Sequence, residues 1–183
     1  MIQIETARLL LQSPHIDLLP MLLDYHQRNP AHFAPWSPVV DATDLENYYT
    51  QQITRYQKHS DEGTGLALFL FEKNNREKII GDVNLSNVVR GVFQSCNMGY
   101  RLDEQAQGKG YMREALQRVV QYAFDEMKLH RIEANIMPHN VRSVKLIPAV
   151  GFEEEGLAKK YLKINGEWEN HLHYAVLNEK MEE

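Results

Sequence analysis

The sequence predicts an α+β fold built around one mixed sheet. Three observations carry this prediction. Residues 111–128 place apolar side chains at the i, i+3 and i+4 spacing of an amphipathic helix. Residues 79–86 alternate apolar and polar side chains, as a half-buried strand does. Asn165-Gly166 favours a type I′ hairpin between two strands. Helices mixed with hairpin-linked strands favour a single domain over residues 1–183.

The N-terminal elements follow from local signals. Residues 2–12 predict a strand, and Ser13-Pro14 predicts a helix start, with a hydroxyl cap and Pro at the first helical position. Three prolines in residues 29–38 predict a loop. Thr43-x-x-Glu46 is a capping-box pattern that predicts a second helix. The apolar faces of the two helices are Leu18, Leu19, Leu22, Leu23 and Tyr25 in the first, and Leu45, Tyr49, Ile53 and Tyr56 in the second.

The rest of the chain alternates strands with helices. Residues 66–71 form an apolar run of strand length, and Arg90-Gly91 predicts a turn into a strand that ends at residues 100–102. Residues 129–137 predict another strand, and residues 141–149 a short helix. Pro148 lies inside this short helix, so we expect the helix to kink or end before Gly151.

Composition excludes several protein classes. The chain carries a net charge of -5 with 43% apolar residues, and this acidic balance argues against a general nucleic-acid binder. No apolar run reaches the ~18 residues of a membrane span. The N-terminus lacks the pattern of a secretory signal, and the one cysteine cannot form an internal disulfide. These observations predict a cytoplasmic protein that does not bind membranes.

The charges are also unevenly spread. Residues 100–145 carry eight Lys/Arg and six Asp/Glu, whereas residues 153–183 carry four Lys/Arg and eight Asp/Glu. A positive middle beside an acidic end would suit an anionic cofactor and a cationic substrate. Ordinary surface scatter also explains the pattern.

The main chemical signal is the glycine-rich segment before the strongest helix. Gly108 and Gly110 let the backbone approach a ligand, and the free N–H groups of a helix start attract anions. Lys109 and Arg113 would add positive charge there. A Walker loop is absent, and a dinucleotide fingerprint would need glycine where the chain has Arg113. The open alternatives are a pyrophosphate site and a simple turn that caps the helix.

The motifs around this segment resemble those of the GNAT (Gcn5-related) N-acetyltransferase superfamily. Gln105-x-x-Gly108-x-Gly110 resembles its acetyl-CoA pyrophosphate motif, and Asn140-x-x-Ser143-x-x-Leu146 followed by Gly151-Phe152 resembles its second conserved segment. The resemblance implies the GNAT acyl-CoA N-acyltransferase fold, with one central mixed, mostly antiparallel sheet flanked by helices.

Further blocks resemble one branch, the ribosomal-protein-alanine N-acetyltransferases, and specifically the type that acts on a small-subunit ribosomal protein. They are Thr6-Ala7-Arg8-Leu9, Phe33-Ala34-Pro35-Trp36, Asn87-Val88-Val89-Arg90-Gly91, Met137-Pro138-His139-Asn140 and residues 151–159.

The resemblance implies a set of site residues for acetyl-CoA. The strand through residues 99–102 would pair with the pantetheine arm and polarise the thioester carbonyl. Backbone amides of residues 107–112 would hold the pyrophosphate, Asn140 would bind the cofactor, and Ser143 would lie near the sulfur. The implied cofactor-binding residues are Tyr100, Arg101, Leu102, Gln107, Gly108, Lys109, Gly110, Tyr111, Met112, Asn140 and Ser143.

The implied reaction is direct attack of an amine on the thioester. An α-amine has a pKa of about 7.7–8.0 and is partly neutral at physiological pH, so a weak base or a water chain suffices. Ser143 is our candidate general acid. Many relatives carry Glu where this chain has Asn97, so we predict no dedicated strong base and keep Glu133 as the base candidate. The other possible bases are Asp82, Glu155 and His171.

Other residues have competing interpretations. His171-x-His173 does not supply enough ligands for a metal, so we expect no metal, and His130 and His139 are isolated. Cys96 could be a nucleophile, but a small buried apolar residue explains it better. The aromatic residues Trp36, Tyr48, Tyr49 and Tyr56 could line a peptide groove or pack in the core. By the resemblance, residues 30–40 and 43–58 would wall the acceptor site.

The leading functional hypothesis is acetylation of the N-terminal alanine of a small-subunit ribosomal protein, with ribosome association and a monomer or homodimer as expected states. The first alternative is acetylation of a small-molecule amine such as an antibiotic, a polyamine or an amino acid. The second is a non-catalytic acyl-CoA-binding or ribosome-assembly protein. A peptide groove should be open and acidic, whereas a small-molecule pocket should be closed.

Overall fold

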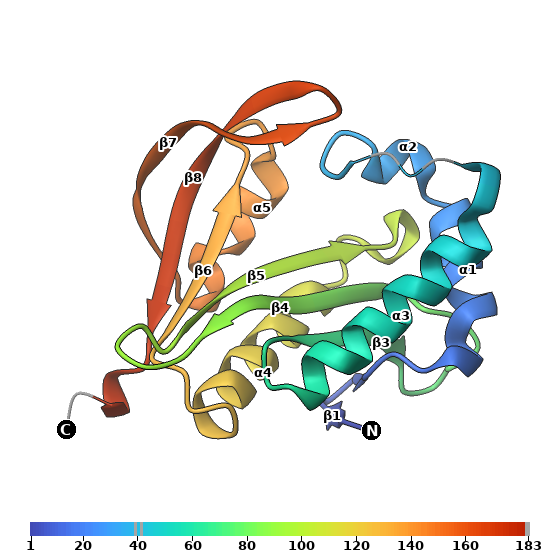
Figure 1. The fold of residues 1–183 in the computed structure, drawn as a ribbon, viewed down its shortest axis with the longest axis horizontal. Coiled ribbons are helices and arrows are strands. Elements are labelled where there is room, and N and C mark those ends of the chain that lie inside the picture. Colours follow the sequence, from blue (N-terminus) through green and yellow to red (C-terminus); the bar gives the residue numbers. More distant parts are fainter. Residues whose placement is uncertain (39, 41, 182–183) are drawn as a thin grey trace.

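The computed structural model describes residues 1–38, 40 and 42–181, and its centre is one eight-stranded sheet (Figure 1). The strand order is β1-β2-β3-β4-β5-β6-β8-β7, and every neighbouring pair is antiparallel except β5 with β6. The predicted mixed, mostly antiparallel sheet is therefore confirmed. The strands are β1 (Gln3–Glu5), β2 (Leu9–Gln12), β3 (Leu66–Glu72), β4 (Gly81–Val89), β5 (Ser95–Leu102), β6 (Arg131–Ile136), β7 (Glu153–Ile164) and β8 (Glu167–Leu177).

Helices cover both faces of the N-terminal part of the sheet. In Figure 1, α4 lies against one face of β4 and β5, and α1 and α3 lie against the other face. The helices are α1 (Leu19–Gln27), α2 (Pro30–Phe33), α3 (Leu45–Asp61), α4 (Tyr111–Asp125) and α5 (Val141–Leu146). No helix in the described part of the chain is long and apolar enough to cross a membrane.

The two helical layers explain why β3 is apolar almost throughout. Leu66, Leu68 and Leu70 belong to the cluster under α4, whereas Phe69 and Phe71 belong to the cluster under α1 and α3. A strand buried on both faces needs apolar side chains at successive positions.

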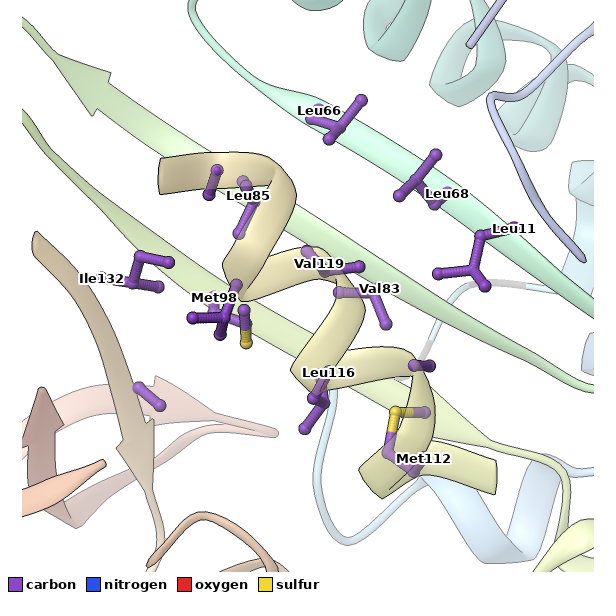
Figure 2. Packing of buried hydrophobic residues seen from close by; sticks show 14 of the residues in the cluster. Leu11, Leu66, Leu68, Val83, Leu85, Met98, Met112, Leu116, Val119 and Ile132 are labelled. Carbon is purple, nitrogen blue, oxygen red and sulfur yellow. The ribbon is translucent and has the colours of Figure 1, made fainter. Parts of the chain in front are cut away.

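The predicted amphipathic face of α4 packs on the sheet. Met112, Leu116 and Val119 project from the helix toward residues of β4 and β5 such as Val83 and Met98 (Figure 2). Leu116 and Val119 have no exposed surface. Burying side chains of this size stabilises the fold by roughly 1.5–3 kcal/mol each, so α4 is anchored firmly at the edge of the site.

The N-terminal prediction is wrong in two places. Residues 2–12 form two strands, β1 and β2, because a tight turn at Thr6 reverses the chain, with the Leu9 amide donating to Thr6 Oγ at 2.9 Å. Ser13 does not cap a helix; its hydroxyl accepts from the Ile2 amide at 3.0 Å, across the β1–β2 pair. The helix α1 begins only at Leu19.

Two further local predictions need correction. The predicted loop at residues 29–38 contains the short helix α2, since Pro30 fits the first turn of a helix. The cap of α3 is Asp44 rather than Thr43: the Asp44 carboxylate accepts from the Asn47 amide at 3.3 Å.

The C-terminal predictions are confirmed. Asn165 and Gly166 have φ values of 49° and 93°, as a type I′ turn between β7 and β8 requires. The helix α5 ends at Leu146, and Pro148 begins a separate 3₁₀ turn (Pro148–Val150) that closes at Gly151.

Candidate active site

The sheet opens at the junction of its one parallel pair. Strands β5 and β6 pair only at Ser95–Asn97 with Arg131–Glu133 and then diverge (Figure 1). The second half of β5, residues 98–102, therefore presents an edge that no described strand pairs with. Such an edge can hydrogen-bond an extended ligand.

The register of β5 shows which backbone groups reach this edge. The Asp103 amide donates to the Ile80 carbonyl at 2.9 Å, which marks a hydrogen-bonded pair between the two strands. Hydrogen-bonded pairs alternate along an antiparallel ladder. The backbone N–H and C=O groups of Met98, Tyr100 and Leu102 therefore point away from β4, toward the opening.

The open edge leads directly to the glycine-rich start of α4. Gly108 and Gly110 adopt φ values of 75° and 77°, a left-handed conformation that strains other residues. Gly110 is the N-cap of α4, and its carbonyl accepts from the Glu114 amide at 3.1 Å. The amides of Tyr111, Met112 and Arg113 precede that first intrahelical bond, so the helix leaves them free for an anion.

A cation that local sequence patterns do not indicate lies at this helix start. Arg8, just before β2, donates to the Lys109 carbonyl at 2.8 Å and lies over the Tyr111 ring at 4.7 Å. Its guanidinium also pairs with Glu114 at 2.7 Å. Arg8 thus braces the glycine-rich turn from outside. The only sequence signal was its place in the Thr6-Ala7-Arg8-Leu9 block.

A chain of polar contacts joins the glycine-rich turn to two other segments. Gln107 Nε2 lies 2.7 Å from His32 Nε2 on α2, and Gln107 Oε1 accepts from Arg142 on α5. The same His32 nitrogen lies 3.2 Å from the carbonyl of Leu102, at the end of the open edge. The glycine-rich turn and α2 are therefore held together. Nothing local in the sequence pairs His32 or Arg142 with position 107.

Beside the open edge lies a cavity of about 810 Å³. Its walls come from α1, α2 and the loop after it, α3, the second half of β5, the end of β6, the start of α5 and the tip of the β7–β8 hairpin. The lining includes the four aromatic residues singled out from the sequence, Trp36, Tyr48, Tyr49 and Tyr56, together with Arg101, Asn135, Asn140, Ser143 and His171. None of the described lining residues is Asp or Glu, so the described part of the cavity lacks the acidity expected of a peptide groove.

A short bridge crosses the cavity. Asn165 Nδ2, in the β7–β8 turn, donates to the Ala34 carbonyl at 2.8 Å and to the Ser37 carbonyl at 3.4 Å. The Trp36 ring lies 5.4 Å from the ring of His139. Segments far apart in the sequence therefore meet over the site. Of the expected acceptor walls, residues 30–40 and 43–58, only Val39 lies outside the described residues.

Arg101 is held by Asp82 in the wall of the cavity. Two guanidinium nitrogens donate to the carboxylate at 3.1 and 3.2 Å, and the Tyr25 hydroxyl donates to it at 3.1 Å. The carboxylate therefore has three donors and is not positioned as a free base. Burial lowers the pKa of neighbouring His26 to about 4, with Arg101 acting in the same direction.

Asn140, Ser143 and Tyr100 meet at the cofactor side of the cavity. The Asn140 side-chain oxygen Oδ1 accepts from the Ser143 amide at 3.2 Å and so caps α5. Burial raises the pKa of Tyr100 to about 12. Among the described residues, no group lies at hydrogen-bond geometry from the buried Tyr100 Oη.

The base candidate Glu133 lies away from the cavity. Its carboxylate accepts from Arg131 Nε at 2.7 Å and lies 3.5 Å from Asn97 Nδ2, and it does not line the cavity. Glu155 is ion-paired with the same Arg131. The structure thus groups three residues considered for the base position, Asn97, Glu133 and Glu155, around one arginine.

His171 lies in the cavity wall with 3% of its surface exposed. Its Nδ1 is 3.1 Å from the Glu169 carbonyl. A carbonyl can only accept, so Nδ1 carries the proton of the neutral ring. Burial lowers the pKa of His171. Of the four residues considered as bases, His171 alone lines the cavity.

The one cysteine, Cys96, is buried. Burial raises the pKa of the Cys96 thiol to about 12, with Glu133 acting in the same direction, so a thiolate nucleophile is disfavoured at neutral pH. No cluster of three or more metal-ligating side chains occurs among the described residues.

Comparison with known proteins places this geometry among acetyltransferases. The family model described as an acetyltransferase (GNAT) domain matches residues 8–153. The Escherichia coli protein named ribosomal protein uS5-alanine N-acetyltransferase is 38% identical over 176 residues, which is 96% of this chain and 90% of that protein.

Solved structures agree with the sequence comparison. The crystal structure of a ribosomal-protein-S5-alanine acetyltransferase from Vibrio fischeri has a TM-score of 0.89 and 33% identity, covering 97% of each chain. RimJ of Mycobacterium smegmatis, in complex with a CoA disulfide, has a TM-score of 0.89 and 24% identity, covering 100% of this chain and 90% of the other. The second likeness speaks for the fold alone.

Proposed function

The chain belongs to the GNAT acetyltransferase family and is an acetyl-CoA-dependent N-acetyltransferase, and from this premise we propose that its acceptor is the N-terminal alanine of ribosomal protein uS5. Two similar proteins carry that activity in their names, and both match nearly the whole chain. The cavity beside the open strand edge is the acceptor site in this proposal.

The residues present fit an acetyl-CoA molecule along the open edge. The amides of Met98, Tyr100 and Leu102 would pair with the pantetheine arm, and one of them would donate to the thioester oxygen. A backbone donor of this kind is worth roughly 3 kcal/mol in analogous oxyanion sites. The buried Tyr100 Oη, which lacks a hydrogen-bond partner among the described residues, fits a site that is completed by a ligand.

The glycine-rich turn would take the pyrophosphate. Free amides at the start of α4 meet phosphate oxygens without a steric penalty, because Gly108 and Gly110 have no side chain to intervene. The residues we propose to bind acetyl-CoA remain Tyr100, Arg101, Leu102, Gln107, Gly108, Lys109, Gly110, Tyr111, Met112, Asn140 and Ser143, with Arg8 and Arg142 as braces. When bound, acetyl-CoA supplies the activated acetyl group.

The electrostatics of the cavity support an α-amine acceptor. A carboxylate in the lining would stabilise an ammonium and raise its pKa. The described lining has none, and the charge of its Arg101 is paired with Asp82. An α-amine with a pKa of about 7.7–8.0 is then free to become neutral. A polyamine carries several ammonium groups and would find no counter-ion among the described lining residues.

Ser143 is our proposed general acid for the departing thiolate. It lines the cavity at the start of α5, next to Tyr100. An alkyl thiol has a pKa near 8.5, so a single hydroxyl donor supported by water can supply the proton.

The observation that carries the proposal is the open edge of β5 between the glycine-rich start of α4 and a cavity whose described lining has no carboxylate. The test is mass spectrometry of purified ribosomal proteins after incubation with the enzyme and isotope-labelled acetyl-CoA. We expect label on the N-terminus of uS5. Label only on a different protein would refute the acceptor, and a complete absence of label would refute the proposed function. Spermidine and free alanine serve as small-amine comparisons.

A further inference from the structure

Where β6 pairs with β8, two buried polar atoms have no hydrogen-bond partner among the described residues: Asn135 Oδ1 and His173 Nε2. Asn135 lies opposite His173 in the β6–β8 register. Side chains two residues apart on a strand share a face, so His171 lies diagonally across from Asn135. Both residues line the cavity.

The His171 ring is held in one tautomer. Nδ1 donates to the Glu169 carbonyl, so the lone pair of the neutral ring is on Nε2. The edge of the Tyr161 ring from β7 packs against it, with ring centroids 5.6 Å apart. These two contacts fix the orientation of the imidazole, and no described residue is hydrogen-bonded to its Nε2.

The groups around His171 keep it neutral at physiological pH. Burial lowers its pKa, and the nearby His173 and His139 act in the same direction. Glu169 acts against them, through its carbonyl and its charge. Tyr161, packed on the ring from β7, is uncharged at this pH. A neutral imidazole with a free Nε2 can accept a proton.

We propose that Asn135 and His171 form the amine site of the acceptor: Asn135 Oδ1 accepts a hydrogen bond from the α-amine, and His171 Nε2 takes the proton that the amine releases. This assignment rests on the proposed function and names a base where the sequence led us to expect none. Asn135 Oδ1 is buried without a hydrogen-bond partner, and an N–H group of the substrate would donate the missing bond.

The proton and bond balance is simple. The bond between the amine nitrogen and the acetyl carbon forms, and the carbon–sulfur bond breaks. One amine proton passes to His171 Nε2. The sulfur leaves with the electron pair of its bond and takes a proton from the Ser143 hydroxyl. Water then carries a proton from the imidazolium back to Ser143, so the products are the N-acetylated chain and CoA thiol.

The test is His171→Asn, with His173→Asn as the matched control. An Asn amide can still donate to the Glu169 carbonyl but offers no group at the position of Nε2. General-base catalysis contributes about 10²–10⁴-fold. We expect kcat/KM for an alanine-starting peptide to fall at least ~100-fold in His171→Asn, with an unchanged KM for acetyl-CoA. His173→Asn, which changes a neighbour that does not line the cavity, should behave like the wild type.

The pH profile separates a base from a structural residue. In the wild type, kcat/KM should fall as pH drops through the pKa of His171, which burial lowers from the ordinary value of a histidine. This acidic limb should be absent in His171→Asn.

Asn135→Ala should raise the KM for the peptide about tenfold and leave kcat nearly unchanged, because a lost ground-state hydrogen bond weakens binding. Wild-type activity and an unchanged pH profile in His171→Asn would overturn the proposal.

Alanine amide, used as a second acceptor, distinguishes a failure of the amine site from a failure of the uS5 proposal. If the wild type acetylates alanine amide but not the uS5 peptide, the acceptor proposal fails, and the His171→Asn comparison is made on alanine amide. If neither amine is acetylated, ¹⁵N NMR of the imidazole decides. Alanine amide should shift the His171 Nε2 resonance in the wild type and not in Asn135→Ala. No shift in the wild type would refute the amine site. The same spectra also report whether each variant is folded.

Discussion

The buried pair of Asp82 and Arg101 offers the sharpest stability prediction. Asp82→Asn removes the charge that accepts two guanidinium bonds and leaves Arg101 without a carboxylate partner. The Asp82 side chain is 7% exposed and that of Arg101 26%. Removing one partner of a buried pair costs about 3–5 kcal/mol. The Asn oxygen keeps one bond and Arg101 is partly exposed, so we expect the lower end, about 3 kcal/mol.

That loss should lower Tm by about 6–12 °C in a chain of this length. The assay is urea unfolding of the wild type, Asp82→Asn and Tyr25→Phe. Tyr25→Phe removes one hydrogen bond to the same carboxylate and should cost only about 1 kcal/mol. The urea midpoint should shift in that order with an unchanged slope. The reasoning fails if Asp82→Asn costs no more than Tyr25→Phe.

Three further predictions test separate parts of the structure. Gly110→Ala should cost about 1 kcal/mol at a φ of 77° and weaken acetyl-CoA binding by calorimetry. Gly63→Ala, at a φ of 67° in open space, should cost the same stability without a change in acetyl-CoA binding. An equal loss of acetyl-CoA binding in both variants would contradict a pyrophosphate site at the glycine-rich turn. The pKa of His26 is about 4 when folded, against 6.5 when unfolded, so the free energy of unfolding should fall as pH drops from 6.5 toward 4. His26→Phe should flatten that slope, and a profile identical to the wild type would exclude His26 as the cause. Cys96→Ala should keep kcat near the wild-type value, whereas Ser143→Ala should lower it about tenfold to a hundredfold; the reverse ranking would favour an acyl-thiol route.

Local signals predicted the parts of the fold that depend on neighbouring residues. The Asn165-Gly166 turn and the end of α5 before Pro148 are set by the backbone preferences of those residues, and both are confirmed. The face of α4 follows from helical periodicity. The errors arise where a distant segment competes for a polar group. The Ser13 hydroxyl bonds the Ile2 amide across the hairpin, so it does not cap a helix.

The candidate site divides in the same way. The conformation of the glycine-rich turn was predictable because it depends on a run of neighbouring residues. The contacts that hold this turn in place were not predictable, because they join distant positions. Arg8 and Lys109 are 101 positions apart, and His32 and Gln107 are 75 apart. The choice of His171 among several possible bases depends on which side chains line one cavity. Sequence spacing does not determine this, because the residues belong to different segments of the sheet.

The bridge made by Asn165 also has a consequence during synthesis. The turn bonds the Ala34 carbonyl across 131 positions of the chain. A chain emerges from the ribosome N-terminus first, so β5 and the start of α4 are available well before β7 and β8. A nascent chain can therefore form the glycine-rich turn while the far wall of the cavity is still unmade. The cavity that we propose as the acceptor site is complete only after the β7–β8 hairpin has been translated.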